Sequence, residues 1–227
     1  MWKFYRNHQG EFIRYTRTNR LIGAQMASTY GEDASKSALR SAYQAVSAQL
    51  APIHAERVDR EVRMHFTAMA AYRDAPLILA YITYRNELDT RPVIEKAWKD
   101  GKRVAVPVCD RGKLVFYEID ALEGMRAGSR GVLEPDPATC TPLSEEDFEG
   151  SICLVPGLVF DADGYRIGYG AGYYANFLAD YPGLKVGLVR ALRISSNPLP
   201  HDDHDVPMDV IVSDGSVWVC NREQADV

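Results

Sequence analysis

The stretch SICLVPGLVFDADGYRIGYGAGYY, residues 151–174, contains an apolar run, a glycine-containing loop and the start of a predicted helix, in that order. The run SICLVP (151–156) is almost wholly apolar, which is typical of a strand buried on both faces of a parallel sheet. Ligands of open α/β sheets bind beyond the carboxyl ends of such strands, near helix starts. The stretch therefore predicts both a fold class and the place of a binding site.

Apolar runs and helical patterns alternate along the rest of the chain. The runs predict further strands, with 114–119 antiparallel and 209–213 the last strand of the core: 77–82, 103–109, 114–119, 184–189 and 209–213. Apolar spacing and helix-ending residues predict helices at 38–50, 51–72, 91–101 and 171–180. Apolar strands that alternate with helices indicate an α/β fold. We expect a three-layer sandwich with a mostly parallel central sheet, forming a single domain over residues 31–227.

The first thirty residues differ from the rest of the chain. Two aromatic and basic segments flank NHQG (7–10), which predicts a hairpin with its turn at those residues. Five basic residues and one acidic residue precede residue 31: Lys3, Arg6, Arg14, Arg17 and Arg20, with Glu11. Interleaved aromatics and arginines also fit an RNA-contacting arm, but a short basic stretch is more often a solvated face. We therefore predict an appended hairpin at 1–30 that packs on the domain or on another subunit.

Composition limits the classes of protein that fit the chain. Of its 227 residues, 46% are hydrophobic and 25% are charged, which are globular values. The net charge of −5 argues against a general nucleic-acid-binding protein. No run approaches the roughly 20 apolar residues that span a bilayer, and the N-terminus lacks the features of a secretory signal. We expect no nucleic-acid or membrane partner and a cytoplasmic location. The separated cysteines are expected to be reduced thiols: Cys109, Cys140, Cys153 and Cys220.

The glycines of the 164–174 loop are the first candidate site. Bare backbone at Gly168, Gly170 and Gly172 allows N–H groups to approach an anion, and a helix start adds positive potential. Arg166 is placed to add a forked contact to a phosphate. The GxGxG spacing matches neither the dinucleotide nor the Walker pattern. A tight turn with close helix–strand packing would use the same glycines, so the residues by themselves leave both interpretations open.

Residues 155–174 resemble the signature of the 5-formyltetrahydrofolate cyclo-ligase family, also called methenyltetrahydrofolate synthetases: VPG, an aromatic residue with Asp, a glycine, then RLGxGxGYYD. Five further segments are similar to the family pattern and occur in the family's order. They are SKSALRSAYQAV (35–46), LAYITYRNELDTRPVI (79–94), GKRVAVPV with GVLEP (101–108 and 131–135), and LPHDDHDVPMDVIVSD (199–214). The resemblance covers about residues 35 to 215.

The resemblance implies ATP-dependent cyclisation of 5-formyltetrahydrofolate to 5,10-methenyltetrahydrofolate, with release of ADP and phosphate. It implies ATP and Mg²⁺ as cofactors, a small-molecule folate substrate, and a monomer or homodimer. The chemistry is consistent with the residues. A formamide oxygen leaves only after phosphorylation, so positioning and charge stabilisation suffice without a covalent nucleophile.

The resemblance also implies roles for individual residues. Lys36 and Arg40, four residues apart on one helix face, would bind ATP phosphates, although the pair also fits a solvated basic face. Glu87 would act near the formyl or pterin end of folate; by itself it equally fits a surface carboxylate. Asp205 would bind Mg²⁺. The loop between nucleotide and folate would comprise Arg166, Gly168, Tyr169, Gly170, Ala171, Gly172, Tyr173 and Tyr174, with Arg166 and Tyr173 in the catalytic group beside Glu87.

Ala175 departs from the family pattern, because the signature has an aspartate after the two tyrosines. In the family that aspartate is implicated in metal binding, and Asn176 points about 100° away on a helix. Two alternatives follow: a folate- or nucleotide-binding relative with weak or no activity, and a different reaction on the same architecture. His201 and His204 also suggest zinc, but two loop histidines among aspartates are more often solvated.

Overall fold

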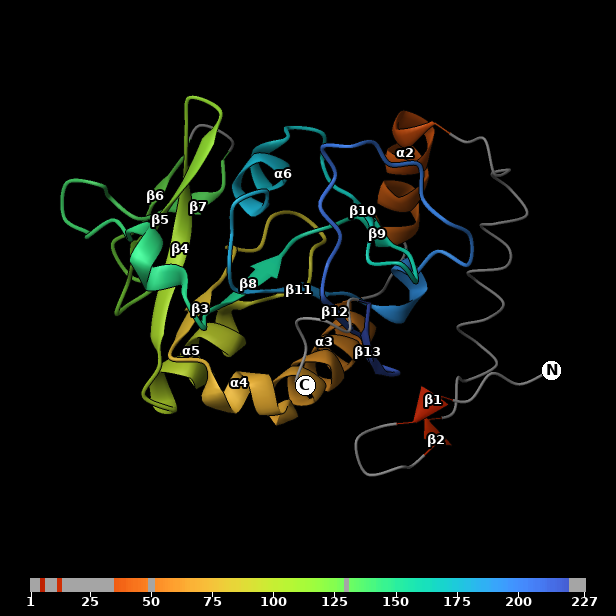
Figure 1. The fold of residues 1–227 in the computed structure, drawn as a ribbon, viewed down its shortest axis with the longest axis horizontal. Coiled ribbons are helices and arrows are strands. Elements are labelled where there is room, and N and C mark those ends of the chain that lie inside the picture. The colour runs from red at the N-terminus through yellow and green to blue at the C-terminus, as the bar shows by residue number, and fades with distance from the viewer. Residues whose placement is uncertain (1–4, 7–11, 14–34, 49–51, 129–130, 221–227) are drawn as a thin grey trace.

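The computed structural model describes residues 5–6, 12–13, 35–48, 52–128 and 131–220. Its centre is a seven-stranded sheet with the order β13-β12-β11-β8-β3-β4-β5 (Figure 1). The strands are β3 (Leu77–Leu79), β4 (Arg103–Asp110), β5 (Lys113–Glu118), β8 (Ile152–Val155), β11 (Leu184–Leu188), β12 (Val210–Val212) and β13 (Val217–Val219). The five inner strands are parallel, and β5 and β13 pair antiparallel at the two edges. The predicted mostly parallel sheet and antiparallel 114–119 strand are confirmed.

Helices cover both faces of the sheet, which confirms the three-layer α/β architecture (Figure 1). One face packs against α3 (Pro52–Ala68), α4 (Ala70–Asp74) and α5 (Arg91–Lys99). The other face packs against α6 (Tyr173–Leu178) and the hairpin of β9 (Val159–Phe160) and β10 (Arg166–Ile167), and α2 (Lys36–Ala48) packs on that hairpin. Smaller elements are β6 (Arg126–Ala127), β7 (Leu133–Glu134), η1 (Glu145–Phe148) and η2 (Ala191–Arg193).

The single helix predicted for 51–72 is wrong, because the chain breaks at Met69. Met69 has an extended ψ of 144° and separates α3 from α4. Residues six apart on a straight helix point about 120° away from each other. The break instead brings the rings of Phe66 and Tyr72 edge to face at 5.1 Å, and both side chains are buried under the sheet.

The structure differs from the predictions at two further places. An unpredicted strand, Val217–Val219, returns antiparallel beside the buried 209–213 strand and forms a partly exposed edge of the sheet. The helix predicted at 171–180 is only six residues long, Tyr173–Leu178.

The N-terminal segment contributes one pair of short strands, β1 (Tyr5–Arg6) and β2 (Phe12–Ile13), which are antiparallel. The other residues of the predicted 1–30 hairpin, including its turn, lie outside the described residues, so the appended arm stays a prediction. No helix in the described part of the chain is both long and apolar enough to cross a membrane.

Asp161 fixes the β9–β10 hairpin, which carries Arg166. Its carboxylate is 1% exposed and accepts the backbone N–H groups of Asp163, Tyr165 and Leu199 at 3.1, 2.9 and 2.8 Å. The hairpin turn and the segment that leads to residues 201–205 therefore share one buried acceptor. Since buried N–H groups without partners are costly, this carboxylate stabilises the relative position of the two segments.

Replacing Asp161 with alanine is expected to lower the free energy of unfolding by about 2–4 kcal/mol, because several donors lose their acceptor at once. Urea denaturation measures the change. The matched control is Asp163→Ala, an exposed carboxylate two residues away in the same turn, for which a change within about 0.5 kcal/mol is expected. Similar losses for both variants would contradict this role of Asp161.

Candidate active site

The carboxyl ends of β3, β8 and β11 are adjacent, because β8 pairs with both of the other strands. The segments that follow these three strands contain Glu87, the glycine loop 168–172 and Arg193, respectively. Parallel strand order thus brings residues from three distant parts of the chain to one edge of the sheet, where α/β proteins bind ligands.

The glycine loop lies against α2. Arg40 Nε donates a hydrogen bond to the carbonyl oxygen of Gly168 at 3.0 Å. Gly170 has a φ of +93°, and a Cβ at this position would lie 3.5 Å from the Arg40 guanidinium. A Cβ on Gly168 or Gly172 would meet no atom within 4 Å. The loop is therefore not packed shut: it combines an adjacent cation with backbone that a ligand can approach. Because α6 has only six residues, these features, rather than a long helix dipole, provide the positive potential.

Lys36 and Asp205, predicted to bind phosphate and metal, contact each other. Lys36 Nζ lies 2.7 Å from Asp202 Oδ2 and 2.5 Å from Asp205 Oδ2. Desolvation lowers the pKa of Lys36, but the two carboxylates outweigh it and the pKa is raised. All three side chains are partly exposed, so their ion pairs are weak enough to exchange partners.

The zinc alternative gains no support from the structure. Within the described ranges, no group of three or more His, Cys, Asp or Glu side chains is arranged to hold a metal ion. His201 stacks on Tyr165 with ring centroids 3.6 Å apart, and its Nδ1 lies 3.0 Å from the carbonyl oxygen of Leu199.

Arg166 is the first residue of β10, two residues before the first glycine of the loop. Its Nη1 donates to the carbonyl oxygen of Val206 at 3.0 Å. Desolvation of the guanidinium lowers the pKa of Arg166 to about 10, and Cys153, Asp205 and Tyr174 are near enough to oppose this effect. At neutral pH Arg166 therefore remains a cation in a poorly hydrated environment, where its interaction with an anion is strong.

Glu87 is buried, with only 7% of its surface exposed, so the surface-carboxylate alternative is wrong. Its Oε2 accepts the backbone N–H of Tyr84 at 2.8 Å. Desolvation raises the pKa of Glu87 to about 7, although the Tyr84 N–H and the Arg193 charge lower it. A carboxyl group that titrates near neutral pH is suited to proton transfer.

Aromatic side chains surround Glu87. Tyr169 packs edge to face on Tyr84, with ring centroids 5.8 Å apart, and burial raises the pKa of Tyr169 to about 12. Tyr174 Oη is buried and has no hydrogen-bond partner among the described residues. Tyr173, the first residue of α6, is half-buried. The site thus contains a buried phenol for which the described part of the chain offers no hydrogen-bond partner, which is a reason to expect a ligand there.

Tyr174 lies within electrostatic range of both Arg166 and Glu87. Burial raises the pKa of this phenol well above its ordinary value, and the charge of Glu87 adds to the shift; Tyr174 in turn opposes the lowering of the Arg166 pKa. The observed contacts place Lys36 beside Asp202 and Asp205, and Arg40 beside the glycine loop. Tyr169 packs on Tyr84, whose backbone N–H is bonded to Glu87. Ala171 is exposed and Ala175 is half-buried within α6.

Sequence patterns missed three buried charges beside this region: Asp59, Arg190 and Arg193. They are 3%, 6% and 3% exposed. Arg190 and Arg193 belong to RALR, which directly follows the apolar 184–189 run. Two arginines directly after a predicted buried strand are the sequence feature from which these site residues could have been predicted. Asp59 has no such indication, because it lies within a helix of otherwise ordinary polar composition.

The chain is similar to known proteins over most of its length. The model of the 5-formyltetrahydrofolate cyclo-ligase family matches residues 32–214. The 5-formyltetrahydrofolate cyclo-ligase of Escherichia coli K12 is 30% identical over 152 residues, which are 63% of this chain and 81% of the relative. The enzyme of the same name from Haemophilus influenzae is 27% identical over 183 residues, or 77% and 95% of the two chains.

Solved structures agree with these matches. The 5,10-methenyltetrahydrofolate synthetase of Aquifex aeolicus superposes with a TM-score of 0.72 at 25% identity, covering 85% of this chain and 95% of that one. The synthetase of Mycoplasma pneumoniae shares the fold, with a TM-score of 0.63 at 20% identity over 79% and 98% of the chains. From the family match and the shared fold together, the chain belongs to the 5-formyltetrahydrofolate cyclo-ligase family.

Proposed function

We propose that the protein converts 5-formyltetrahydrofolate to 5,10-methenyltetrahydrofolate with ATP as phosphoryl donor, releasing ADP and phosphate. The observation that carries the proposal is the buried Tyr174 hydroxyl, which has no hydrogen-bond partner among the described residues, in a site where burial raises the pKa of Glu87 to about 7 and lowers that of Arg166 to about 10. The segments that follow β3 and β8 thus carry a carboxyl group suited to a proton and a cation suited to a phosphate. This arrangement fits a reaction that joins phosphoryl transfer to ring closure.

The chemistry determines what the residues must do. Transfer of the γ-phosphoryl group to the formyl oxygen makes that oxygen a leaving group. The N10 amine then attacks the formyl carbon, the carbon–oxygen bond breaks, and phosphate leaves with that oxygen. N10 loses one proton in the process. Glu87, with a pKa of about 7, is suited to accept it. Tyr173 at the start of α6 and Tyr174 would orient the folate.

The phosphate side of the site would use Lys36, Arg40, Arg166 and the backbone of residues 168–172. Arg40 already contacts this loop through its hydrogen bond to the Gly168 carbonyl oxygen. Lys36 would exchange Asp202 and Asp205 for a phosphate, and the exposure of these ion pairs makes the exchange inexpensive. The freed carboxylate of Asp205 fits Mg²⁺, which favours one or two carboxylates together with phosphate oxygens. The ion would neutralise part of the negative charge of ATP.

A second candidate function is a relative that binds folate and nucleotide with little turnover. Ala175 is the observation that favours it, since the family aspartate at this position is missing. An assay that monitors methenyltetrahydrofolate by its absorbance, with and without ATP and Mg²⁺, distinguishes the two candidate functions. ATP-dependent turnover is expected. Binding of both ligands by calorimetry without turnover would support the second function, and no binding of either would exclude both.

Replacing Ala175 with aspartate is expected to lower the Mg²⁺ concentration for half-maximal rate by about tenfold, because a charge-assisted metal contact of roughly 1–2 kcal/mol would be gained. A magnesium titration of the turnover rate measures the change. Asn176→Asp adds the same charge on a different face of α6 and should have little effect. Equal effects from both variants would show that general charge, rather than a metal ligand, is responsible.

A further inference from the structure

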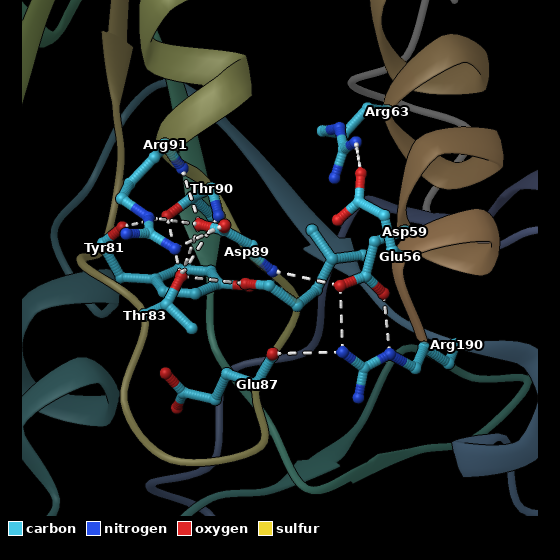
Figure 2. Close-up of polar contacts among 11 residues, drawn as sticks. Glu56, Asp59, Arg63, Tyr81, Thr83, Glu87, Asp89, Thr90, Arg91 and Arg190 are labelled. Atoms are coloured by element: carbon cyan, nitrogen blue, oxygen red, sulfur yellow. Dashed lines mark hydrogen bonds and ion pairs between the residues drawn. The ribbon is translucent and has the colours of Figure 1, made fainter. Parts of the chain in front are cut away.

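Asp59 and Arg190 form a buried ion pair beside the Glu87 segment (Figure 2). Arg190 Nε lies 2.6 Å from Asp59 Oδ1, and Arg190 Nη2 lies 2.9 Å from Asp59 Oδ2. This bidentate geometry joins α3 to the segment that follows β11. Two parallel hydrogen bonds fix the plane of the guanidinium, and therefore the directions of its other N–H groups.

Those other N–H groups point at the backbone of the Glu87 segment. Arg190 donates through Nη1 to the carbonyl oxygen of Asn86 at 2.9 Å, and through Nη2 to that of Glu87 at 3.3 Å. Arg193 Nη2 also donates to the Asn86 carbonyl. Asp59 Oδ2 accepts the N–H of Asp89 at 3.3 Å. The backbone on both sides of Glu87 is thus bonded to groups from two distant elements.

The Glu87 carboxylate has no part in these bonds. Figure 2 shows it pointing away from Arg190, while its backbone carbonyl faces the guanidinium. An arginine paired directly with this carboxylate would stabilise the charged form and make it a poor proton acceptor near neutral pH. Because the charge of Arg190 is paired with Asp59, Arg190 can fix the backbone of Glu87 while the Glu87 carboxyl group stays free to titrate.

We propose that Asp59, Arg190 and Arg193, together the arginine clamp, are positioning residues that hold the Glu87 carboxyl group at the reacting end of the folate. The inference rests on the proposed function for the role of Glu87. The clamp acts on Glu87 through the carbonyls of residues 86 and 87, and the charge of Arg193 also lowers the pKa of the Glu87 carboxyl group.

A purely stabilising ion pair behaves differently from a positioning one. Replacing both members of a buried pair with apolar side chains of similar size often restores or improves stability. Apolar side chains, however, cannot donate to the carbonyls of residues 86 and 87. The double variant Asp59→Leu/Arg190→Met therefore separates the two roles: stability is expected to be largely kept, while the position of Glu87 is lost.

A second buried pair offers a matched control. Lys185 Nζ lies 3.0 Å from Asp209 Oδ2, which also accepts the Lys185 backbone N–H at 2.8 Å. Lys185 is near the amino end of β11, whereas Arg190 follows the carboxyl end of the same strand. The double variant Lys185→Met/Asp209→Leu thus makes the same kind of chemical change at the amino ends of the parallel strands, away from the candidate site.

The experiment measures kcat and KM for both substrates, urea unfolding, and amide hydrogen exchange of residues 84–89. For the clamp double variant we expect kcat to fall about 100-fold, as for a misplaced catalytic group, with little change in KM for ATP and faster exchange at 84–89. The control should keep kcat and the exchange of this segment. Arg190→Lys, which keeps the charge but not the fork, should fold and lose kcat in part.

Recovery of kcat together with stability in the clamp double variant, or unchanged exchange at 84–89 in Arg190→Lys, would overturn the proposal. Wild-type turnover is measured first. If the wild type proves inactive, the proposed function fails. The role of the arginine clamp is then tested by amide hydrogen exchange of residues 84–89. Slow exchange in the wild type and fast exchange in both clamp variants would support the proposal, and equal exchange rates would refute it.

Discussion

Replacing Glu87 with glutamine is expected to lower kcat by about 100-fold or more and, at the same time, to stabilise the protein at pH 8. Glutamine has nearly the same shape and can still accept the Tyr84 N–H. It cannot accept a proton from the substrate, so the catalytic step suffers. It also carries no charge, so the cost of burying the carboxylate disappears.

The sign of the stability effect follows from the direction of the pKa shift. Burial raises the pKa of Glu87 from 4.5 to about 7 in the folded protein. The folded state therefore binds this proton more tightly than the unfolded state does. The resulting stabilisation is fully present below pH 4.5 and is lost as the pH rises to 7. The difference corresponds to about 3 kcal/mol, and the glutamine variant should not show this loss.

Urea unfolding at pH 5 and pH 8 measures this effect. We expect Glu87→Gln to gain stability relative to the wild type on going from pH 5 to pH 8, by up to about 3 kcal/mol. Glu118→Gln serves as a control, because its carboxylate is partly exposed and pairs with Arg103 at the edge of the sheet. An equal difference from the wild type at both pH values would contradict the raised pKa of Glu87.

Arg166→Ala is expected to weaken ATP binding by about 10- to 150-fold, because a charge-assisted hydrogen bond of roughly 1.5–3 kcal/mol is lost. The poorly hydrated surroundings of this arginine, which lower its pKa to about 10, place it at the upper part of that range. Calorimetric titration with a non-hydrolysable ATP analogue measures the change. Arg166→Lys, which keeps the charge without the fork, should be intermediate.

The control for this prediction is Arg126→Ala. Arg126 is exposed, and its Nη2 pairs with Asp136 at 3.2 Å on the β6–β7 hairpin. Its loss removes the same formal charge from the protein but none from the site. Equal weakening by the two alanine variants would place the phosphates elsewhere, and urea unfolding of Arg166→Ala distinguishes lost binding from lost folding.

Local pattern was sufficient for most of the fold. Apolar runs such as 151–156 indicated buried parallel strands because every side chain in them faces a covered surface. Local pattern did not predict the helix break at Met69, because a backbone torsion there depends on packing. It also did not predict the Val217–Val219 strand, because a short edge strand carries little periodic information.

The site was predicted unevenly for the same reason. The glycines and Arg166 are close together in sequence, and the structure brings the glycine loop beside Arg40. The arginine clamp was missed, because Asp59 and Arg190 are 131 residues apart and neither belongs to a local pattern.

The sequence by itself determined the alternation of the main strands and helices and the bare backbone at residues 168–172, since apolar periodicity and missing side chains are local properties. Only the tertiary structure decided the charge of Glu87. A carboxyl pKa depends on the water excluded by neighbours and on their charges, and here those neighbours come from segments far apart along the chain.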